Sequence, residues 1–137
     1  MSAKTKPKSR KENKAPASIV WFEIPADNAD RAKKFYNGLF GWKINPFPGM
    51  GDYQHIDTGG ADASPDGALM KRMCPEHQGF TNYVLVDSVD KAAAKVEKLG
   101  GKIHRTKTAV PQMGYFVICQ DTEDNVFALW ERNEGAK

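Results

Sequence analysis

Ile19–Pro25 is a short, mainly apolar run that is rich in β-branched and aromatic residues, and this pattern predicts a β-strand whose side chains point to two faces in turn. Trp21 and Glu23 share one face with Ile19, so one face of the strand combines a large aromatic ring with a carboxylate. The opposite face is apolar throughout and consists of Val20, Phe22 and Ile24. We therefore expect the second face to enter the core.

The segment that follows has the period of an amphipathic helix. Its apolar residues recur every three or four positions and are Ala29, Ala32, Phe35, Tyr36 and Leu39. Either Asp27 or Asn28 can cap the helix N-terminus, and Gly41 is a stop signal. Three short strands should follow, at 42–46, 52–57 and 67–72, with turns marked by Gly59-Gly60 and Ser64-Pro65-Asp66-Gly67.

The same plan occurs again about sixty residues later. Thr81–Val86 predicts a strand, Asp87 or Ser88 can cap the next helix, and Gly100-Gly101 ends it. Further strands are expected near 102–106, 115–120 and 125–131. The chain therefore has two β-α-β-β-β modules, which is an α+β fold. We expect four strands of each module to form a half-barrel, a helix to cover each convex face, and a cleft between the modules.

The boundaries follow from this repeat. We expect one domain over 18–133, with module one at 18–75, module two at 79–133 and a linker at 73–79 that contains Pro75 and Gly79. A short tail of residues 134–137 follows. Residues 1–17 lack aromatic and β-branched side chains except for Thr5, and this composition predicts a disordered basic tail.

Charge is distributed unevenly along the chain. The formal net charge is +3, but residues 1–16 hold six basic side chains against one acidic side chain. The remainder is slightly acidic, so it has no surplus of basic groups for binding phosphates. The tail is either a solvated arm, which we prefer, or a contact for nucleic acid or an acidic partner. Nucleic-acid binding is not expected of the folded part.

Two further features bear on location. No apolar run approaches the ~20 residues that a membrane-spanning helix needs, and the basic N-terminus has no apolar signal core. Cys74 and Cys119 are the two cysteines, which gives no basis for a disulfide framework. We therefore expect a cytoplasmic protein.

Several motifs resemble one family. They are Arg31-Ala-Lys-Lys-Phe-Tyr36 before Gly41-Trp42, Gly67-Ala-Leu-Met-Lys-Arg72, Val86-Asp-Ser-Val-Asp90, Leu99-Gly-Gly101 and Asp121-Thr-Glu-Asp-Asn-Val-Phe-Ala-Leu-Trp130. Together they resemble the vicinal oxygen chelate superfamily, which includes glyoxalase-type lyases, ring-cleaving dioxygenases and bleomycin-binding proteins. The nearest resemblance is to small bacterial glyoxalase-like proteins and spans about residues 18–133. Family members pair their modules within one chain or between two, so we expect a homodimer and leave open which modules pair.

In metal-using members of this family, each module supplies two ligands, usually His and Glu, from its first and last strands. The resemblance places these positions at Trp21 and Met70 in module one, and at Thr81 and Ala128 in module two. Trp and Ala offer no lone pair, the Met thioether is too soft for Mg, Mn or Ni, and one Thr hydroxyl cannot hold an ion. We therefore predict that the family metal is lost and that no cofactor is bound.

The same strand parity predicts the lining of the cleft. Its members are Trp21, Glu23, Met70, Arg72, Thr81, Tyr83, Ala128 and Trp130. Mostly apolar and aromatic, this set suits a flat organic ligand held by ring stacking and one or two hydrogen bonds. Alternatively, the side chains simply fill the barrel as core. Glu23 is either an anchor or catalytic acid/base, or a rim residue that is merely solvated.

Other candidate sites are weaker. Cys74 and His77 fall three residues apart, but a zinc site needs more ligands, and we expect a plain surface loop. His55, His104 and Cys119 share no spacing with them. In the turn before the last strand, Asp124 replaces the Gly usual in the family, and Asp tolerates positive φ well enough to keep that turn.

Three hypotheses result. The first is a metal-free protein that binds a small apolar or aromatic molecule. The second is an enzyme, either a glyoxalase-type lyase or a dioxygenase-like protein with displaced metal ligands, or a metal-independent enzyme that uses Glu23 as acid/base. The third is a module that contacts a partner or nucleic acid through its basic tail.

Overall fold

The computed structural model describes residues 16–61, 64–73 and 79–137. The chain forms two compact units, which are described separately. The first unit is Ile19–Tyr83, and the second consists of Val84–Lys137 with Met1–Ser18. Residues 1–15 of the predicted basic tail and most of the predicted 73–79 linker lie outside the described residues.

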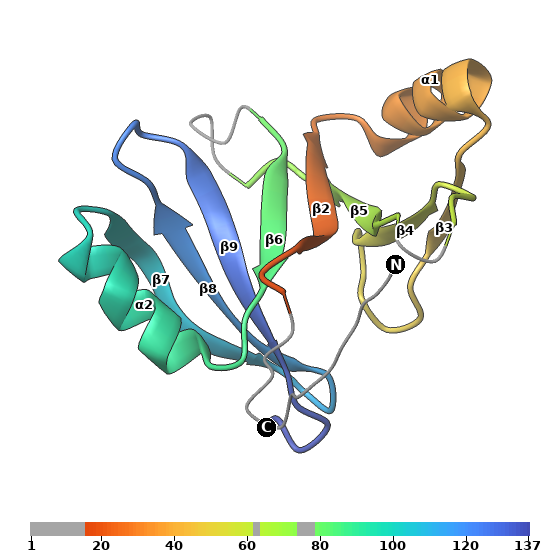
Figure 1. The fold of residues 1–137 in the computed structure, drawn as a ribbon. Helices are drawn as coiled ribbons and strands as arrows, with labels where there is room; N and C mark the ends of the chain where they lie inside the picture. Colours follow the sequence, from red (N-terminus) through yellow and green to blue (C-terminus); the bar gives the residue numbers. More distant parts are fainter. Residues whose placement is uncertain (1–15, 62–63, 74–78) are drawn as a thin grey trace, which may run out of the picture. The chain divides into compact units, whose positions relative to one another are not determined.

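The first unit follows the predicted β-α-β-β-β order (Figure 1). Its elements are β2 (Ile19–Ala26), α1 (Ala29–Phe40), β3 (Lys43–Pro46), β4 (Gln54–Asp57) and β5 (Asp66–Lys71). The strand order is β3-β4-β5-β2. Strand β2 runs parallel to β5, while β4 is antiparallel to both β3 and β5. The first and last strands of the module therefore lie side by side.

The second module repeats this order. It contains β6 (Thr81–Leu85), α2 (Val89–Lys98), β7 (Lys102–Val110), β8 (Gly114–Gln120) and β9 (Val126–Arg132). The boundary between the units falls within β6. The order β6-β9-β8-β7 mirrors that of the first module. The predicted α+β fold of two βαβββ modules is thus confirmed.

Both helices begin and end at residues that the sequence marked. The Asn28 side chain accepts a hydrogen bond of 2.9 Å from the Arg31 backbone N–H, and Ser88 caps α2 in the same way through Lys91. Asn28 and Ser88 therefore cap the helices, rather than the aspartates that precede them. Helix α1 ends at Gly41, whose φ of 75° is the left-handed conformation that glycine adopts at least cost.

Each helix packs on its own apolar cluster. In the first unit the buried residues are Ile24, Ala26, Ile44, Ile56 and Leu69, with Phe22 packed beside them. In the second unit they are Val89, Val117, Cys119 and Leu129. The predicted parity of the first strand is confirmed, because Phe22 and Ile24 pack with the helix side. Helix α1 contributes no buried residue, whereas Val89 of α2 is fully buried.

Strand β7 extends beyond the predicted 102–106 to Val110. Its register against β8 shifts between Ile103 and Arg105 and again before Thr108. These irregularities break the two-residue alternation, and that is why the sequence pattern stopped short. Lys107 contributes to the extended part, since its ammonium lies 4.4 Å from the centre of the Tyr115 ring and 2.9 Å from an Asp90 oxygen.

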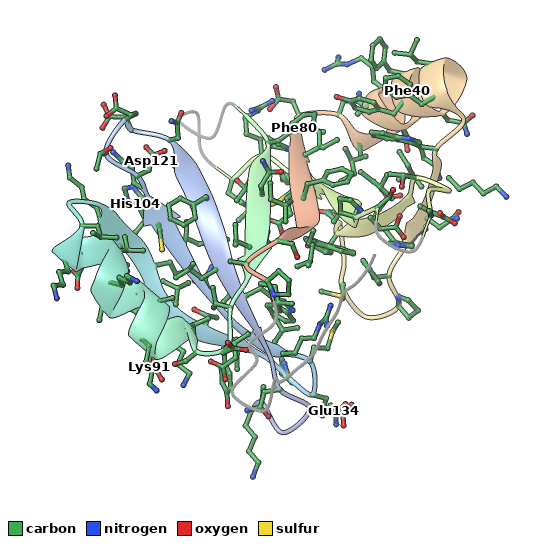
Figure 2. All side chains as sticks on the ribbon, in the orientation of Figure 1. Phe40, Phe80, Lys91, His104, Asp121 and Glu134 are labelled. Carbon is green, nitrogen blue, oxygen red and sulfur yellow. The ribbon has the colours of Figure 1, made fainter. Side chains whose placement is uncertain are left out.

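The turn before β9 is kept as predicted. Asp121, labelled in Figure 2, accepts hydrogen bonds from the backbone N–H groups of Glu123 and Asn125. Asp124 adopts a φ of 66°. The Asn125 hydrogen bonds are the main cause that lowers the pKa of Asp121. No helix in the described part of the chain is long and apolar enough to span a membrane.

Candidate site on the Trp21 face of the first unit

One side of the first unit's sheet carries linked polar and aromatic side chains, and we call it the Trp21 face. It comprises Trp21 and Glu23 of β2, Tyr53 and His55 around the start of β4, and Asp66 of β5. The strand register brings them together, because Trp21 lies beside Asp66 and Glu23 lies beside Ala68, which is also the partner of His55. The core side chains point to the opposite side.

Glu23 is the centre of a hydrogen-bonded chain. Its side chain is 9% exposed. Tyr53 donates a hydrogen bond of 2.6 Å to Oε2, and Tyr83 donates one of 2.9 Å to Oε1. The Trp21 indole N–H donates to the Tyr53 hydroxyl oxygen at 2.9 Å. Each carboxylate oxygen therefore has a phenolic donor, which is the compensation that a buried charge requires.

Tyr53 is held as a neutral donor. Burial raises the pKa of its hydroxyl, and the neighbouring Glu23 charge and hydrogen bond raise it further. The hydrogen bond from Trp21 acts in the opposite direction but is the smallest cause. The phenol consequently keeps its proton and continues to donate to Glu23.

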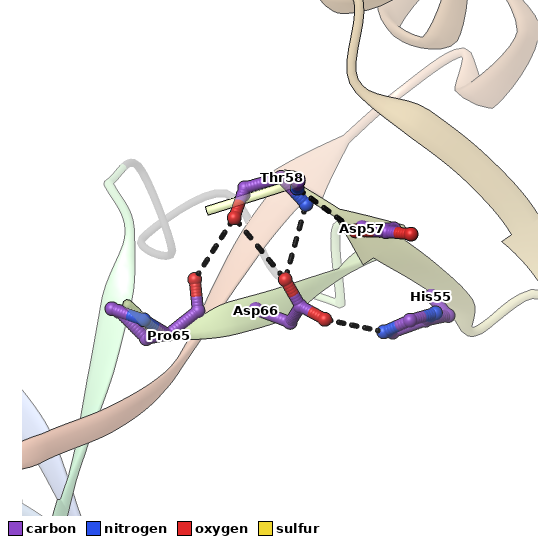
Figure 3. A network of polar contacts seen from close by, with 6 residues as sticks. His55, Asp57, Thr58, Pro65 and Asp66 are labelled. Carbon is purple, nitrogen blue, oxygen red and sulfur yellow. Dashed lines mark hydrogen bonds and ion pairs between the residues drawn. The ribbon is translucent and has the colours of Figure 1, made fainter. Parts of the chain in front are cut away.

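A second polar network lies on the same face (Figure 3). His55 Nε2 lies 3.1 Å from Asp66 Oδ2. The other oxygen of Asp66 accepts from the Thr58 backbone N–H at 3.0 Å and from the Thr58 hydroxyl at 3.2 Å. Asp66 thus ties the histidine to the end of β4.

Aromatic rings connect the two networks. The Trp21 and His55 rings are nearly parallel, with an interplanar angle of 10° and centroids 6.0 Å apart. Phe47 lies 6.2 Å from Trp21, 5.3 Å from His55 and 5.8 Å from Tyr53, measured between ring centroids. These distances are typical of interacting aromatic pairs. The face therefore combines a ring cluster with one buried carboxylate and one oriented imidazole.

The structure brings some predicted site residues together and assigns others elsewhere. Tyr53 links Trp21 to Glu23, and Tyr83 donates directly to Glu23. Thr81 is buried, and Met70 is half-buried on β5. Arg72 makes an ion pair of 3.0 Å with Asp27.

Ala128 and Trp130 belong to the second unit, on β9. Ala128 is fully buried and lies opposite Ile118, while Trp130 lies opposite Phe116. The two alternate along β9 on the side that does not pack on α2, as the parity predicted. A cleft between the modules that includes them stays a prediction.

Sequence reasoning missed several residues of this face, namely Phe47, Tyr53, His55 and Asp66. A signal was present, because Tyr53 and His55 alternate within the predicted 52–57 strand. The resemblance places the family metal on the first and last strands of each module. It therefore pointed to no residue of this middle strand.

The four family metal positions do not fit a divalent ion. The only nitrogen of the Trp21 side chain carries a hydrogen and donates it to Tyr53. Ala128 has no donor atom, and Met70 offers a soft thioether. Within the described residues, no group of three or more His, Cys, Asp or Glu side chains could hold a metal ion. The side chains of Trp21, Met70 and Ala128 therefore offer no hard ligand at these positions, and the loss of the family metal stays a prediction.

The remaining candidates offer less. Burial raises the pKa of the Cys119 thiol to about 11, so this cysteine stays protonated near neutral pH. His104 lies against Gln120 in the second unit. Cys74 and His77 lie outside the described residues.

A hollow of about 620 Å³ beside α1 and β3 of the first unit is open to solvent, and its lining is about equally polar and apolar. Its lining includes the lysines Lys33, Lys34 and Lys43 and the acid Asp30. Long charged side chains of this kind usually project into water. The hollow therefore gives no specific argument for a ligand.

Comparisons with known proteins agree with this architecture. The family described as "Bleomycin resistance protein-like N-terminal" matches residues 18–59. CFP32 of Mycobacterium bovis, whose name proposes a glyoxylase, is 30% identical over 82% of the chain. The match covers 45% of CFP32, so the chain spans about half the length of this relative.

A second relative matches along nearly its whole length. A "Glyoxylase-like domain-containing protein" of Didymella fabae is 33% identical, over 83% of this chain and 93% of its own. Among solved structures, a member of the glyoxalase/bleomycin resistance protein/dioxygenase superfamily from Vibrio splendidus shares the fold. Its TM-score is 0.63 at 12% identity, and the match covers 85% of this chain and 99% of that one. The chain therefore belongs to the glyoxalase/bleomycin-resistance family of the vicinal oxygen chelate superfamily.

Proposed function

We propose that this protein is a metal-free, glyoxalase-like binding protein that holds a small apolar or aromatic molecule against the Trp21 face. The observation that carries the proposal is the Trp21–Tyr53–Glu23 chain. It occupies a family metal position with an indole N–H that is committed to a hydrogen bond. Where the resemblance places a metal ligand, this chain therefore offers an aromatic surface.

The composition of the face supports an aromatic ligand. Trp21, Tyr53 and His55 are each only partly buried, so their rings have surface left for contact. Aromatic side chains offer large contact areas with few rotatable bonds, which limits the entropy lost on binding. Glu23 supplies a fixed acceptor on the same face, since a carboxylate has about four lone-pair sites and the two phenols use two.

Metal analysis tests the metal-free part of the proposal. Protein purified without a His tag should contain no stoichiometric metal, and Ni, Zn, Mn and Fe(II) should leave its melting temperature unchanged. Stoichiometric metal, or a stabilisation of several degrees that Glu23→Gln removes, would contradict it.

Tryptophan fluorescence tests the binding part. An aromatic ligand on the Trp21 face should quench the wild-type protein, and Trp21→Phe should lose most of the quenching. Trp42→Phe is the matched control, because Trp42 packs beside the core on the helix side of the same unit. Equal quenching in Trp21→Phe and the wild type would place the ligand elsewhere.

A second candidate function is an enzyme in which Glu23 acts as acid/base. The observation in its favour is a nearly buried carboxylate held in place by two phenols, since fixed geometry favours proton transfer. Glyoxalase-type lyase activity is the reaction that the names of the relatives suggest. Turnover by the wild type that Glu23→Gln abolishes would favour this function over simple binding.

We also propose a homodimer in the cytoplasm. Strands β3 and β7 each form one end of their module's strand order, and Phe35, Leu39 and Phe40 of α1 are exposed. A second copy could cover such surfaces. The presence of a buried, protonated Cys119 agrees with a reducing compartment.

The basic tail supports a third candidate, a contact with nucleic acid or an acidic partner. Residues 1–15 lie outside the described residues, so only the charge of the sequence supports it. Deletion of residues 1–16 should abolish such binding, and the binding should weaken steeply with salt. Binding that survives the deletion would rule out this role for the tail.

A further inference from the structure

His55 is the one imidazole on the Trp21 face, and its surroundings fix its protonation pattern. Asp66 presents Oδ2 to His55 Nε2 at 3.1 Å, while Oδ1 accepts from the Thr58 backbone N–H and from the Thr58 hydroxyl, whose hydrogen is shared with the Pro65 carbonyl. These donors favour Asp66 as an acceptor-only carboxylate. The hydrogen between Asp66 and His55 must then belong to Nε2. In the neutral ring, Nδ1 is consequently left with a lone pair.

The ring itself is held in one orientation. Trp21 stacks nearly parallel to it, and Phe47 packs at an interplanar angle of 49°. The His55 side chain is still 36% exposed. Within the described residues, no side chain or backbone group is paired with Nδ1. A fixed acceptor on a partly exposed side chain therefore lies among rings that we propose as the ligand surface.

We infer that His55 contacts the ligand directly, with Nδ1 accepting a hydrogen bond from a hydroxyl or N–H group carried by an aromatic molecule. Asp66 is the positioning residue, because it holds the imidazole in the Nε2–H form. This inference rests on the proposed binding of an aromatic molecule to the Trp21 face.

The chemical class of the ligand follows from the groups around it. His55 Nδ1 and the Glu23 carboxylate are both acceptors, so the ligand has to supply donors. A phenol or an aromatic amine meets this requirement, whereas an aromatic ether of the same size does not. A ligand that carries no donor leaves these acceptors without a hydrogen-bond partner, and this weakens its binding. The face should therefore select ligands that carry donors.

A purely structural role makes a different prediction. If the His55–Asp66 pair only clamps β4 to β5, its loss lowers stability and does not alter which ligands bind. The experiment must therefore compare two ligands within each variant.

The probes are 2-naphthol and 2-methoxynaphthalene, which share one ring system and differ in the donor hydrogen. Dissociation constants are measured by calorimetry for each variant, and the ratio between the two compounds is the readout. The wild type should prefer 2-naphthol by about three- to tenfold, the range expected for one hydrogen bond. His55→Phe keeps a ring for stacking and should bring the ratio close to one.

Asp66→Asn should reduce the preference without removing it, because the imidazole remains but its orientation and tautomer are no longer fixed. Asp57→Asn is the matched control. Asp57 is a neighbouring acid whose carboxylate accepts from the Gly59 backbone N–H and does not contact His55. The Asp57→Asn variant should prefer 2-naphthol over 2-methoxynaphthalene as strongly as the wild type does.

Nuclear magnetic resonance supplies a second measurement that needs no substitution. A long-range ¹H–¹⁵N spectrum of the neutral wild-type imidazole should show a protonated Nε2 and an unprotonated Nδ1 for His55. Asp66→Asn should shift the ring toward a mixture of tautomers. A predominant Nδ1–H form in the wild type would overturn the inference even if no variant folds.

The outcomes distinguish a failure of the His55 inference from a failure of the proposed function. If both compounds bind and quench Trp21 but His55→Phe keeps the wild-type ratio, the inference about His55 is wrong and the proposed function stands. If neither compound binds the wild type at millimolar concentration, the proposed aromatic binding fails and the inference fails with it.

Discussion

The Tyr53 hydroxyl donates a hydrogen bond of 2.6 Å to Glu23, across 30 positions of sequence. The same oxygen accepts the indole N–H of Trp21. One phenol thus pairs with one oxygen of the buried Glu23 carboxylate and with the partly buried indole N–H of Trp21 at once. Removal of any one member of such a network is destabilising, because it leaves the remaining polar groups without partners.

Replacement of Tyr53 by Phe should therefore lower the free energy of unfolding by about 2–3 kcal/mol, the range for a hydrogen bond to a charged group. Urea denaturation would measure this change. Tyr36→Phe is the matched control, because its ring packs against the core and its hydroxyl has no described hydrogen-bond partner. Similar losses in the two variants would show that the Glu23 contact contributes little.

Two glycines near the end of α1 should respond to alanine with opposite signs. Gly41 has a φ of 75°, whereas Gly38 lies within the helix and has no neighbouring atom near a Cβ. Gly41→Ala should destabilise by about 1 kcal/mol, and Gly38→Ala should stabilise by about 1 kcal/mol. Thermal denaturation of both variants would measure the difference. Destabilisation by Gly38→Ala would indicate that α1 ends earlier than described.

Features that depend on neighbouring residues could be predicted from the sequence, whereas contacts between distant strands could not. Helix caps and stops depend on neighbouring residues, so the sequence identified Gly41 and narrowed each N-cap to an aspartate or to Asn28 or Ser88 directly after it. The alternation of Trp21 and Glu23 placed both on one face correctly. The partners of Glu23 could not be identified, because Tyr53 and Tyr83 come from other strands, 30 and 60 residues away. Their approach depends on strand register and turn length, which local patterns do not specify.

Cys119 should make stability fall at alkaline pH. Its pKa is about 11 in the folded protein, compared with an ordinary value of 9.0, because burial disfavours the thiolate. The unfolded chain releases this proton first, so the contribution is complete below pH 9 and is lost as pH rises towards 11. The loss should reach about 2–3 kcal/mol, at 1.36 kcal/mol for each pH unit between the two values.

Urea denaturation between pH 8 and 11 would test this prediction. Cys119→Ala should show a smaller fall in stability over that range than the wild type, since other groups titrate equally in both. Parallel curves for the two proteins would mean that the Cys119 thiol does not contribute to the pH dependence.

The exposed apolar residues of α1 should stabilise the proposed homodimer. Phe40, at the end of α1 (Figure 2), is 57% exposed, and the centroids of its ring and the Trp42 ring lie 4.9 Å apart. A charge at this position would oppose burial against a second copy but would cost the folded unit little. Phe40→Glu should therefore shift sedimentation equilibrium towards monomer, whereas Leu99→Glu, at a residue 68% exposed beside α2, should not. A wild-type protein that is monomeric at all concentrations would contradict the proposed homodimer. A dimer that tolerates Phe40→Glu would show that Phe40 does not lie in the interface.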